Sequence, residues 1–169
     1  MKPVYLLAPI ALTLFGCGGS DDEPHNSGHD NTGTPYAYEV IECGRSWHTT
    51  IDEPSREVIT DVHRFREVYG VSDLNNQDDI PTIDFDTQQV VAMHAGRKPN
   101  PGHSLRIDQV VEVEDRIEVR YTNILPNSSG DCAYPSVIAH PYCFISMAKS
   151  DLSVTYSGIT EEGSCGGEE

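Results

Sequence analysis

The most extended pattern of hydrophobic and polar positions in the chain covers residues 83–121. An apolar run, residues 90–95, ends at Gly96, and after a short loop apolar residues return at alternating positions. Alternation with a period of two is typical of a strand that buries one face. The stretch therefore predicts a strand, a loop rich in Pro and Gly, and two further strands.

Shorter segments on both sides of this stretch predict the remaining elements. We expect further strands at residues 38–43, 44–50, 57–59, 137–139, 142–147 and 152–156. One segment, residues 60–70, has apolar residues at helical spacing, with Thr60 suited to the N-cap and Gly70 to the C-cap. These patterns predict a single α+β domain, mainly antiparallel β, as a sandwich or partly closed barrel with one short helix packed on it.

The first sixteen residues have the features of a secretory signal peptide. Lys2 is followed by an apolar region that is shorter than the roughly 20 residues of a membrane-spanning helix. Leu14, Gly16 and Cys17 are similar to the cleavage box of bacterial lipoproteins. We therefore expect cleavage before Cys17 and a lipid on that cysteine. The alternative is an ordinary cleaved signal in which Cys17 has no role.

Composition divides the rest of the chain into three parts. Residues 17–36 are polar and acidic, with too few apolar side chains to offset the entropy cost of ordering, so they predict a disordered tether. Residues 37–157 contain the strand and helix patterns and form the expected domain. The acidic, Gly-rich residues 158–169 predict a loose tail.

Acidic residues outnumber basic residues by 27 to 11, which gives the chain a formal net charge of −16. Such a protein repels phosphate backbones and anionic lipid surfaces. We therefore expect no nucleic-acid partner, and membrane attachment through the N-terminal lipid alone. Gly18, next to the lipidated cysteine, is similar to the residue found in outer-membrane lipoproteins. The expected location is the bacterial cell envelope, at the outer membrane.

Four cysteines remain once Cys17 carries lipid. They are Cys43, Cys132, Cys143 and Cys165. An even number in an exported chain predicts two disulfides, for which three pairings are possible. We favour Cys132 with Cys143, and Cys43 with Cys165. A zinc site is the alternative, although these cysteines lack the close spacing typical of zinc ligands.

The loop after Gly96 is the candidate binding element. It contains Lys98, Pro99, Asn100, Pro101, Gly102 and His103. A rigid scaffold that presents a proline-stiffened loop lowers the ordering cost of binding a partner. A plain connection between two strands explains the same residues without a partner.

No motif in the sequence is a strong catalytic signature. The chain contains neither a helical H-E-x-x-H zinc motif nor a G-x-S-x-G nucleophile motif. We therefore expect a protein without enzymatic activity and without a cofactor. The alternative is a metal-dependent enzyme that uses His94, His103 and His140.

The order of features in residues 60–156 resembles the C-terminal domain of the PrcB family, protease complex subunits of bacterial envelopes. The features are the helix, IDF at residues 83–85, the strand that ends in glycine, the Pro/Gly loop followed by SLRI, and HPYCFISMAKSD at residues 140–151. In that family the loop usually reads Pro-Thr-Gly-Gly-Tyr, whereas this chain has Pro-Asn-Pro-Gly-His at residues 99–103. The resemblance implies a non-catalytic protein that binds, stabilises or inhibits an exported partner, typically a protease. A structural envelope protein without a specific ligand is the other alternative.

Overall fold

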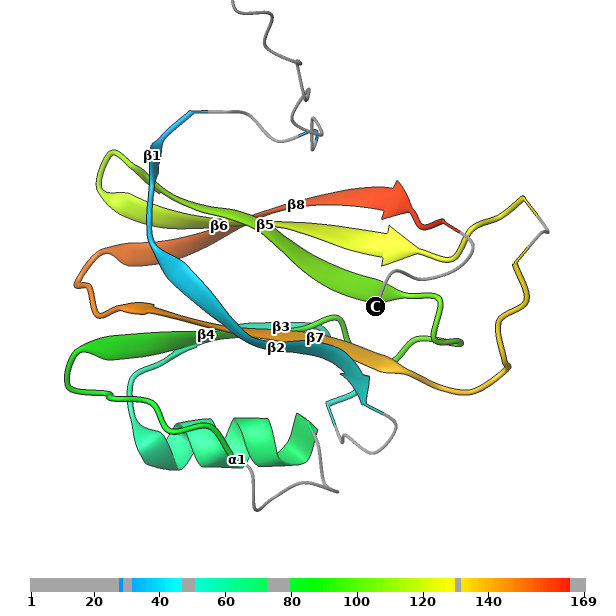
Figure 1. The fold of residues 1–169 in the computed structure, drawn as a ribbon, viewed down its shortest axis with the longest axis horizontal. Helices are drawn as coiled ribbons and strands as arrows, with labels where there is room; N and C mark the ends of the chain where they lie inside the picture. Colours follow the sequence, from blue (N-terminus) through cyan, green and yellow to red (C-terminus); the bar gives the residue numbers. More distant parts are fainter. Residues whose placement is uncertain (1–27, 29–31, 47–50, 73–79, 130–131, 165–169) are drawn as a thin grey trace, which may run out of the picture.

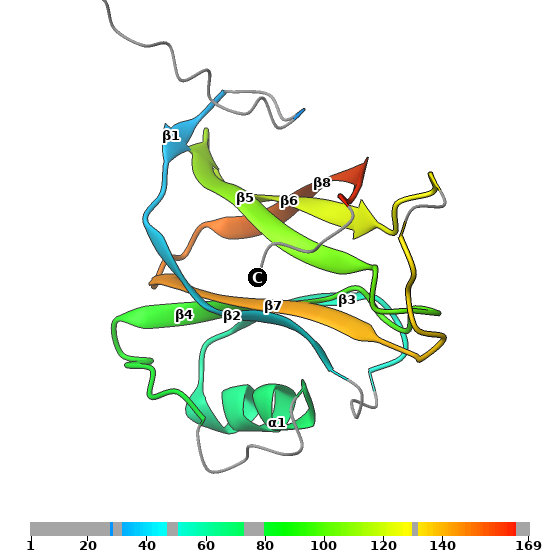
Figure 2. The same cartoon turned by 45° about the vertical axis from the view of Figure 1, so that its right-hand side comes forward.

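Two four-stranded sheets pack face to face, and one helix covers the outer face of one of them (Figures 1 and 2). The computed structural model describes residues 32–46, 51–72, 80–129 and 132–164, together with Gly28. The first sheet, sheet A, has the strand order β1 (Thr34–Pro35), β5 (Ser104–Val113), β6 (Arg116–Leu125), β8 (Ser153–Glu162). The second, sheet B, has the order β2 (Tyr38–Ser46), β7 (His140–Ala148), β4 (Gln88–His94), β3 (Ser55–Ile59). The prediction of a mainly antiparallel α+β sandwich is confirmed, and the sheets do not close into a barrel.

One pair of neighbouring strands is parallel. β6 and β8 pair residue by residue from Arg116 with Ser153 to Leu125 with Glu162, whereas the other neighbours in both sheets are antiparallel. Parallel neighbours need a crossover connection. Here the chain leaves β6, runs through β7 in the opposite sheet and returns as β8. The sequence pattern did not predict this crossover.

The main core lies between the two sheets. The buried residues that form it are Val91, Met93, Ala95, Leu105, Val110, Ile117, Val119, Tyr121, Cys143, Ile145 and Met147. β5 and β6 contribute alternate residues, which accounts for the alternating pattern in the sequence. β4 and β7 are buried on both faces because α1 packs on their other side, so these strands have continuous apolar runs.

A second core lies between sheet B and α1 (Val62–Ser72). Phe65 and Val68 of the helix pack there with Phe144 of β7. The expected N-cap was Thr60, but the side chain of Asp61 caps the helix instead. Its Oδ1 accepts hydrogen bonds from the backbone N–H groups of His63 at 3.0 Å and Arg64 at 2.9 Å.

Four boundaries differ from the sequence prediction. β1 lies inside the expected tether, and β8 continues to Glu162, inside the expected tail. Helix α1 continues through Gly70, which was expected to be its C-cap, and ends at Ser72. Residues 137–139 are not a strand, since only Ala139 makes an isolated bridge, with Lys98. For β1, β8 and residues 137–139, pairing with a distant segment, which local pattern does not show, decides where the element ends.

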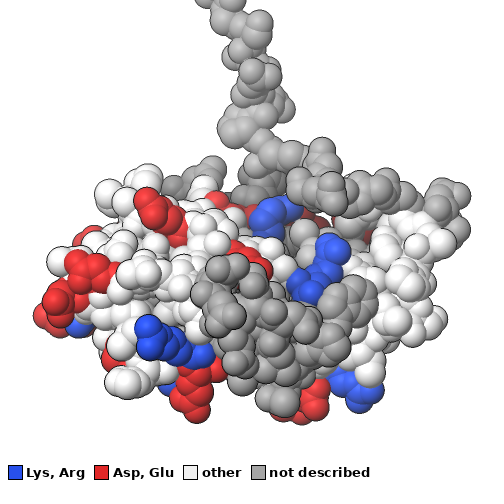
Figure 3. Space-filling view, turned by 60° about the horizontal axis from the view of Figure 1, so that its bottom comes forward, with Lys and Arg blue, Asp and Glu red and all other residues white. Residues whose placement is uncertain are grey.

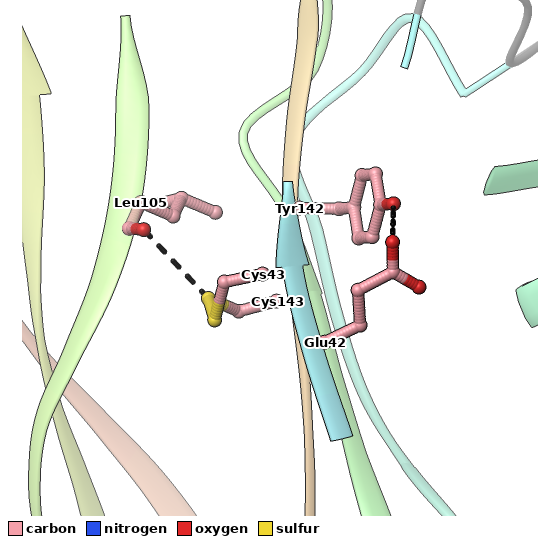
Figure 4. The surroundings of a disulfide bond; sticks show 5 residues. All are labelled: Glu42, Cys43, Leu105, Tyr142 and Cys143. Atoms are coloured by element: carbon pink, nitrogen blue, oxygen red, sulfur yellow. Dashed lines mark hydrogen bonds between the residues drawn. A yellow bond between two sulfur atoms is a disulfide. The ribbon is translucent and has the colours of Figure 1, made fainter. Parts of the chain in front are cut away.

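The favoured disulfide pairing is wrong. Cys43 of β2 forms a disulfide with Cys143 of β7, directly opposite it in the ladder, and the pair faces Leu105 of β5 (Figure 4). Neither Cys132 with Cys143 nor Cys43 with Cys165 is therefore formed. Cys132 is also disulfide-bonded, as predicted, but Cys165 and Cys17 lie outside the described residues. The two joined cysteines are 100 residues apart in sequence, so only the strand order brings them together.

Candidate functional site

The candidate loop is held to a second loop by a two-hydrogen-bond bridge. The N–H of Lys98 donates to the carbonyl of Ala139 at 2.8 Å, and the N–H of Ala139 donates to the carbonyl of Lys98 at 3.0 Å. Ala139 is fully buried. Because side chains alternate along an extended backbone, the neighbouring Pro99 and Ile138 project to the opposite, outer side. Both are exposed.

The two loops together present an exposed apolar group at one end of the sandwich, on the right in Figure 1. We call it the loop surface, and it consists of Pro99, Pro135, Val137 and Ile138. Val137 is 40% exposed and Ile138 is 41% exposed, and the N–H of Val137 donates to the carbonyl of Pro135 at 2.9 Å. Single exposed apolar residues are common on protein surfaces, but four on adjoining loops form a candidate contact site.

Local contacts fix the candidate loop in one shape. The side-chain Oδ1 of Asn100 accepts a hydrogen bond from the N–H of Gly102 at 3.0 Å, which is the geometry of an Asx turn. A Cβ on Gly102 would lie 2.6 Å from Cε1 of Tyr134, so the tyrosine ring packs directly on the glycine. The Tyr134 hydroxyl accepts a hydrogen bond from the N–H of Asn127 at 3.1 Å. The loop is therefore ordered before any partner binds.

The base of the loop is anchored to a third segment. Gly96 has φ of 72°, and a Cβ there would lie 2.6 Å from the carbonyl oxygen of Asp52. The same carbonyl accepts a hydrogen bond from the N–H of Arg97 at 2.8 Å. The side-chain Oδ1 of Asp52 lies 3.0 Å from Nε2 of His140. Segments around residues 52, 96 and 140 therefore meet beneath the loop.

His103 closes the loop and is partly buried. Burial, and next the positive charge of Lys98, lower the pKa of His103 below its ordinary value of 6.5. The imidazole is therefore neutral at neutral pH and offers one donor and one acceptor to a partner.

The three histidines of the metal alternative do not form a metal site. His94 lies on the helix side of sheet B, where burial lowers its pKa to about 4 and its Nδ1 is 3.5 Å from the hydroxyl of Ser55. His140 is on the same face but pairs with Asp52, and His103 lies in the loop before β5. Among the residues that the structure describes, no group of three or more His, Cys, Asp or Glu is placed to hold a metal ion.

A polar clamp joins α1 to sheet B on the helix side. Glu42 of β2 accepts a hydrogen bond from the Tyr142 hydroxyl at 2.6 Å (Figure 4). It accepts another from the Tyr69 hydroxyl of α1 at 2.5 Å. Because both carboxylate oxygens are occupied by tyrosines, this half-buried acid has a structural function. It connects helix, edge strand and central strand.

A small cavity of about 240 Å³ lies where the chain crosses from β1 to β2. Its lining includes Tyr36, Tyr38 and Asp108. The pKa of Tyr38 is raised by burial and, to a smaller extent, by the Asp108 carboxylate. Pockets for small-molecule ligands usually have volumes of about 300 to 1,000 Å³. The cavity is below that range, so we do not assign a ligand to it.

The surface charge is mixed on the helix side. Acidic and basic side chains are interspersed on the described surface in Figure 3, and Arg64 of α1 is hydrogen-bonded to both Glu57 and Glu67. The described residues in this view show no continuous basic surface of the kind that binds nucleic acid. No described helix is long and apolar enough to cross a membrane.

The sequence predicted one of the two loops that form the loop surface, but not the other. The prolines and glycine marked residues 97–103 as a distinctive loop. Val137 and Ile138 were assigned to a strand because β-branched residues favour strands. The signal that could have identified them is the pair of prolines, Pro135 and Pro141, that flanks them. Trp47 and His48, an aromatic residue and a histidine adjacent in sequence, lie outside the described residues.

No family model, curated protein or solved structure matches the chain. The resemblance to the PrcB family therefore remains a prediction from the sequence.

Proposed function

We propose that this protein is a non-catalytic, lipid-anchored module of the bacterial envelope that binds an exported partner protein through the loop surface. The observation that carries the proposal is the pair of interlocked loops that exposes Pro99, Pro135, Val137 and Ile138. The PrcB resemblance makes an exported protease the first partner to test. Measuring the activity of such a protease with and without this protein would distinguish stabilisation from inhibition.

Pre-ordered loops favour binding because little conformational entropy is lost on association. The Lys98–Ala139 bridge, the Asn100 turn and the Tyr134 contact restrict the backbone in the free protein. Binding energy at interfaces concentrates in a few apolar side chains that become fully desolvated. Val137 and Ile138 supply such side chains, and Lys98 and His103 supply polar groups beside them.

The arrangement of the domain is compatible with an N-terminal anchor at Cys17. The first residues of the domain lie on the outer face of sheet A, where the carbonyl of Thr32 accepts a hydrogen bond from Nη2 of Arg120 at 2.7 Å. Helix α1 is on the opposite side of the molecule, and the loops are at one end (Figure 2). A partner at the loop end therefore does not have to displace the described N-terminal residues, which begin at Thr32 on sheet A.

Site-specific photo-crosslinking in the native envelope tests the proposal. A photoreactive amino acid replaces Ile138, and in a control chain it replaces Val40, an exposed apolar residue of β2 that is 54% exposed. We expect one protein to be crosslinked through position 138 and not through position 40. The same adducts from both positions, or none from either, would contradict the proposal, and the second result would favour a structural protein without a ligand.

A further inference from the structure

We propose that the free edge of β8 is a second binding surface, which takes an extended, basic segment of another protein as an added strand. β8 is the last strand of sheet A and pairs with β6 along ten residues. Within residues 32–46, 51–72, 80–129 and 132–164, no strand pairs with its other side. Alternate backbone N–H and C=O groups of β8 therefore point outward without a strand partner.

The other outer strands of the two sheets have features that protect an edge. β2 has an irregularity between Val40 and Glu42, and β5, which β1 covers only in part, has one between Ile107 and Gln109. β3 has only five residues, and its Arg56 points inward over the ring of Tyr121, 4.9 Å from the centroid. Irregular pairing, short length and inward charges are the usual protections of edge strands.

β8 has none of these protections. Its sequence, SVTYSGITEE, contains no Lys, Arg or Pro, and its pairing with β6 has no register shift. The residues from Ser153 to Thr160 are uncharged, and Val154, Thr155, Ile159 and Thr160 are β-branched. Such residues favour an extended backbone and accept a neighbouring strand.

The edge is also held in position by contacts with β6. A Cβ on Gly158 would lie 2.3 Å from Cζ of Tyr121, so this ring packs directly against the strand. The hydroxyl of Thr155 donates to the carbonyl of Ile117 at 3.3 Å. A strand added to β8 therefore meets an ordered template, which lowers the entropy cost of pairing.

Charge selects the kind of segment that fits. Glu161 and Glu162 form one end of β8. Glu161 is ion-paired with Arg106 at 3.2 Å but keeps 40% of its side chain exposed, and Glu162 accepts a hydrogen bond from the Ser128 hydroxyl at 2.7 Å. The whole chain has a formal net charge of −16, so a second copy of the protein is repelled. Lys or Arg residues in a partner strand complement the acidic end and the overall charge.

This surface is distinct from the loop surface. It lies along the side of sheet A, whereas Pro99, Pro135, Val137 and Ile138 belong to the loops at the end of the sandwich. The inference therefore does not rest on the proposed function.

Hydrogen exchange read by mass spectrometry tests the inference on the full chain in detergent micelles. The probe is a synthetic peptide of alternating Lys and Val, about nine residues long, which is near the upper end of the usual strand length and close to that of β8. Its controls are the same peptide with Glu in place of Lys and one with Pro at its centre. At a free concentration of about ten times its dissociation constant, the Lys peptide should slow exchange of the β8 amides about tenfold. Neither control peptide should do so.

A matched pair of variants locates the contact. Thr160→Lys places a positive charge on the exposed part of β8 and should weaken binding of the Lys peptide about tenfold. Ser136→Lys makes the same change of charge in an exposed loop and should leave binding unchanged. Val137→Ser with Ile138→Ser, which alters the loop surface, should also leave peptide binding unchanged.

The inference would be overturned by no protection of β8, by protection of β2 or β3 instead, or by equal binding of the Lys and Glu peptides. Protection of β8 that rises with protein concentration in the absence of peptide would show that a second copy occupies the edge, and would also overturn it.

Discussion

The contact between Gly102 and Tyr134 holds together the two loops that form the loop surface. The nearest ring atoms would lie 2.6, 2.8 and 2.9 Å from a Cβ at position 102. Such distances are shorter than any van der Waals contact of a methyl group, and the ring is itself restrained by its hydrogen bond with Asn127. Only glycine therefore fits at position 102 without a shift of Tyr134.

Gly102→Ala should consequently destabilise the protein by about 1 to 3 kcal/mol, the usual cost of inserting a methyl group into a packed contact. Urea unfolding measures the change. In a Tyr134→Ala background the same substitution should cost much less, because the obstructing ring is absent. An equal cost in both backgrounds would show that the ring contact is not the cause.

His94 should make the stability of the protein depend on pH. Burial lowers the pKa of this histidine from 6.5 to about 4, with Glu57 opposing the shift. The unfolded chain therefore binds a proton at a higher pH than the folded chain, so stability is lost as the pH falls from about 6.5 towards 4. The slope reaches about 1.4 kcal/mol per pH unit for one proton. Between pH 7 and pH 4, wild type should lose more stability than His94→Gln in urea unfolding, and parallel curves for the two proteins would contradict this.

At the scale of elements, periodicity predicted most of the strands but not their partners. β4, β5 and β6 were evident from the apolar run and the alternation in residues 83–121, and α1 from its helical spacing. Pairing between β2 and β7, or β6 and β8, joins segments far apart in the chain, and nothing in a local pattern specifies it. The disulfide prediction was wrong for that reason.

Only part of the candidate site was predicted, because the rest depends on a contact between distant segments. Pro and Gly mark a loop directly, so residues 97–103 could be selected from sequence. Val137 and Ile138 favour a strand by propensity, and their exposure follows from the bridge between Lys98 and Ala139. That bridge is a tertiary contact between segments about 40 positions apart, which propensity does not include.

The Cys43–Cys143 disulfide should contribute strongly to stability. It closes a segment of 100 residues, and the chain-entropy estimate for such a loop is about 4 to 5 kcal/mol. Replacing both cysteines with Ala should lower the free energy of unfolding by about that amount in urea titrations. Peptide mapping without reduction should recover Cys43 joined to Cys143, and Cys132 joined to Cys165. A peptide that joins Cys132 to Cys143 would contradict the strand register.

On the scale of the whole molecule, three regions of the sandwich face different directions. The N-terminal residues of the domain lie on sheet A, α1 covers sheet B, and the loop surface is at one end (Figure 1). The helix completes the core, since Phe65 and Val68 are buried against sheet B. This division leaves the loop surface clear of the described N-terminal residues.

Cys17→Ser tests the proposed attachment. We expect the variant to move from the membrane fraction to the soluble fraction, because the net charge of −16 gives the protein surface no affinity for anionic lipids. Immunoblots of fractionated cells measure the distribution, with Cys132→Ser as a control that changes a cysteine but not the lipidation box. Unchanged membrane association of the Cys17 variant would contradict lipid anchoring at this residue.

The most direct test of the central claim is a binding titration with the partner that crosslinks through position 138. Val137→Ser with Ile138→Ser removes the apolar side chains of the loop surface, and Val40→Ser with Val58→Ser is the matched control at exposed residues elsewhere. The loop pair should raise the dissociation constant by about 100-fold, as expected for the loss of two interface anchors worth about 1.4 kcal/mol each. The control pair should not change it, and the melting temperatures should remain close to that of wild type. Equal dissociation constants for the two double variants would contradict the claim that the loop surface binds the partner.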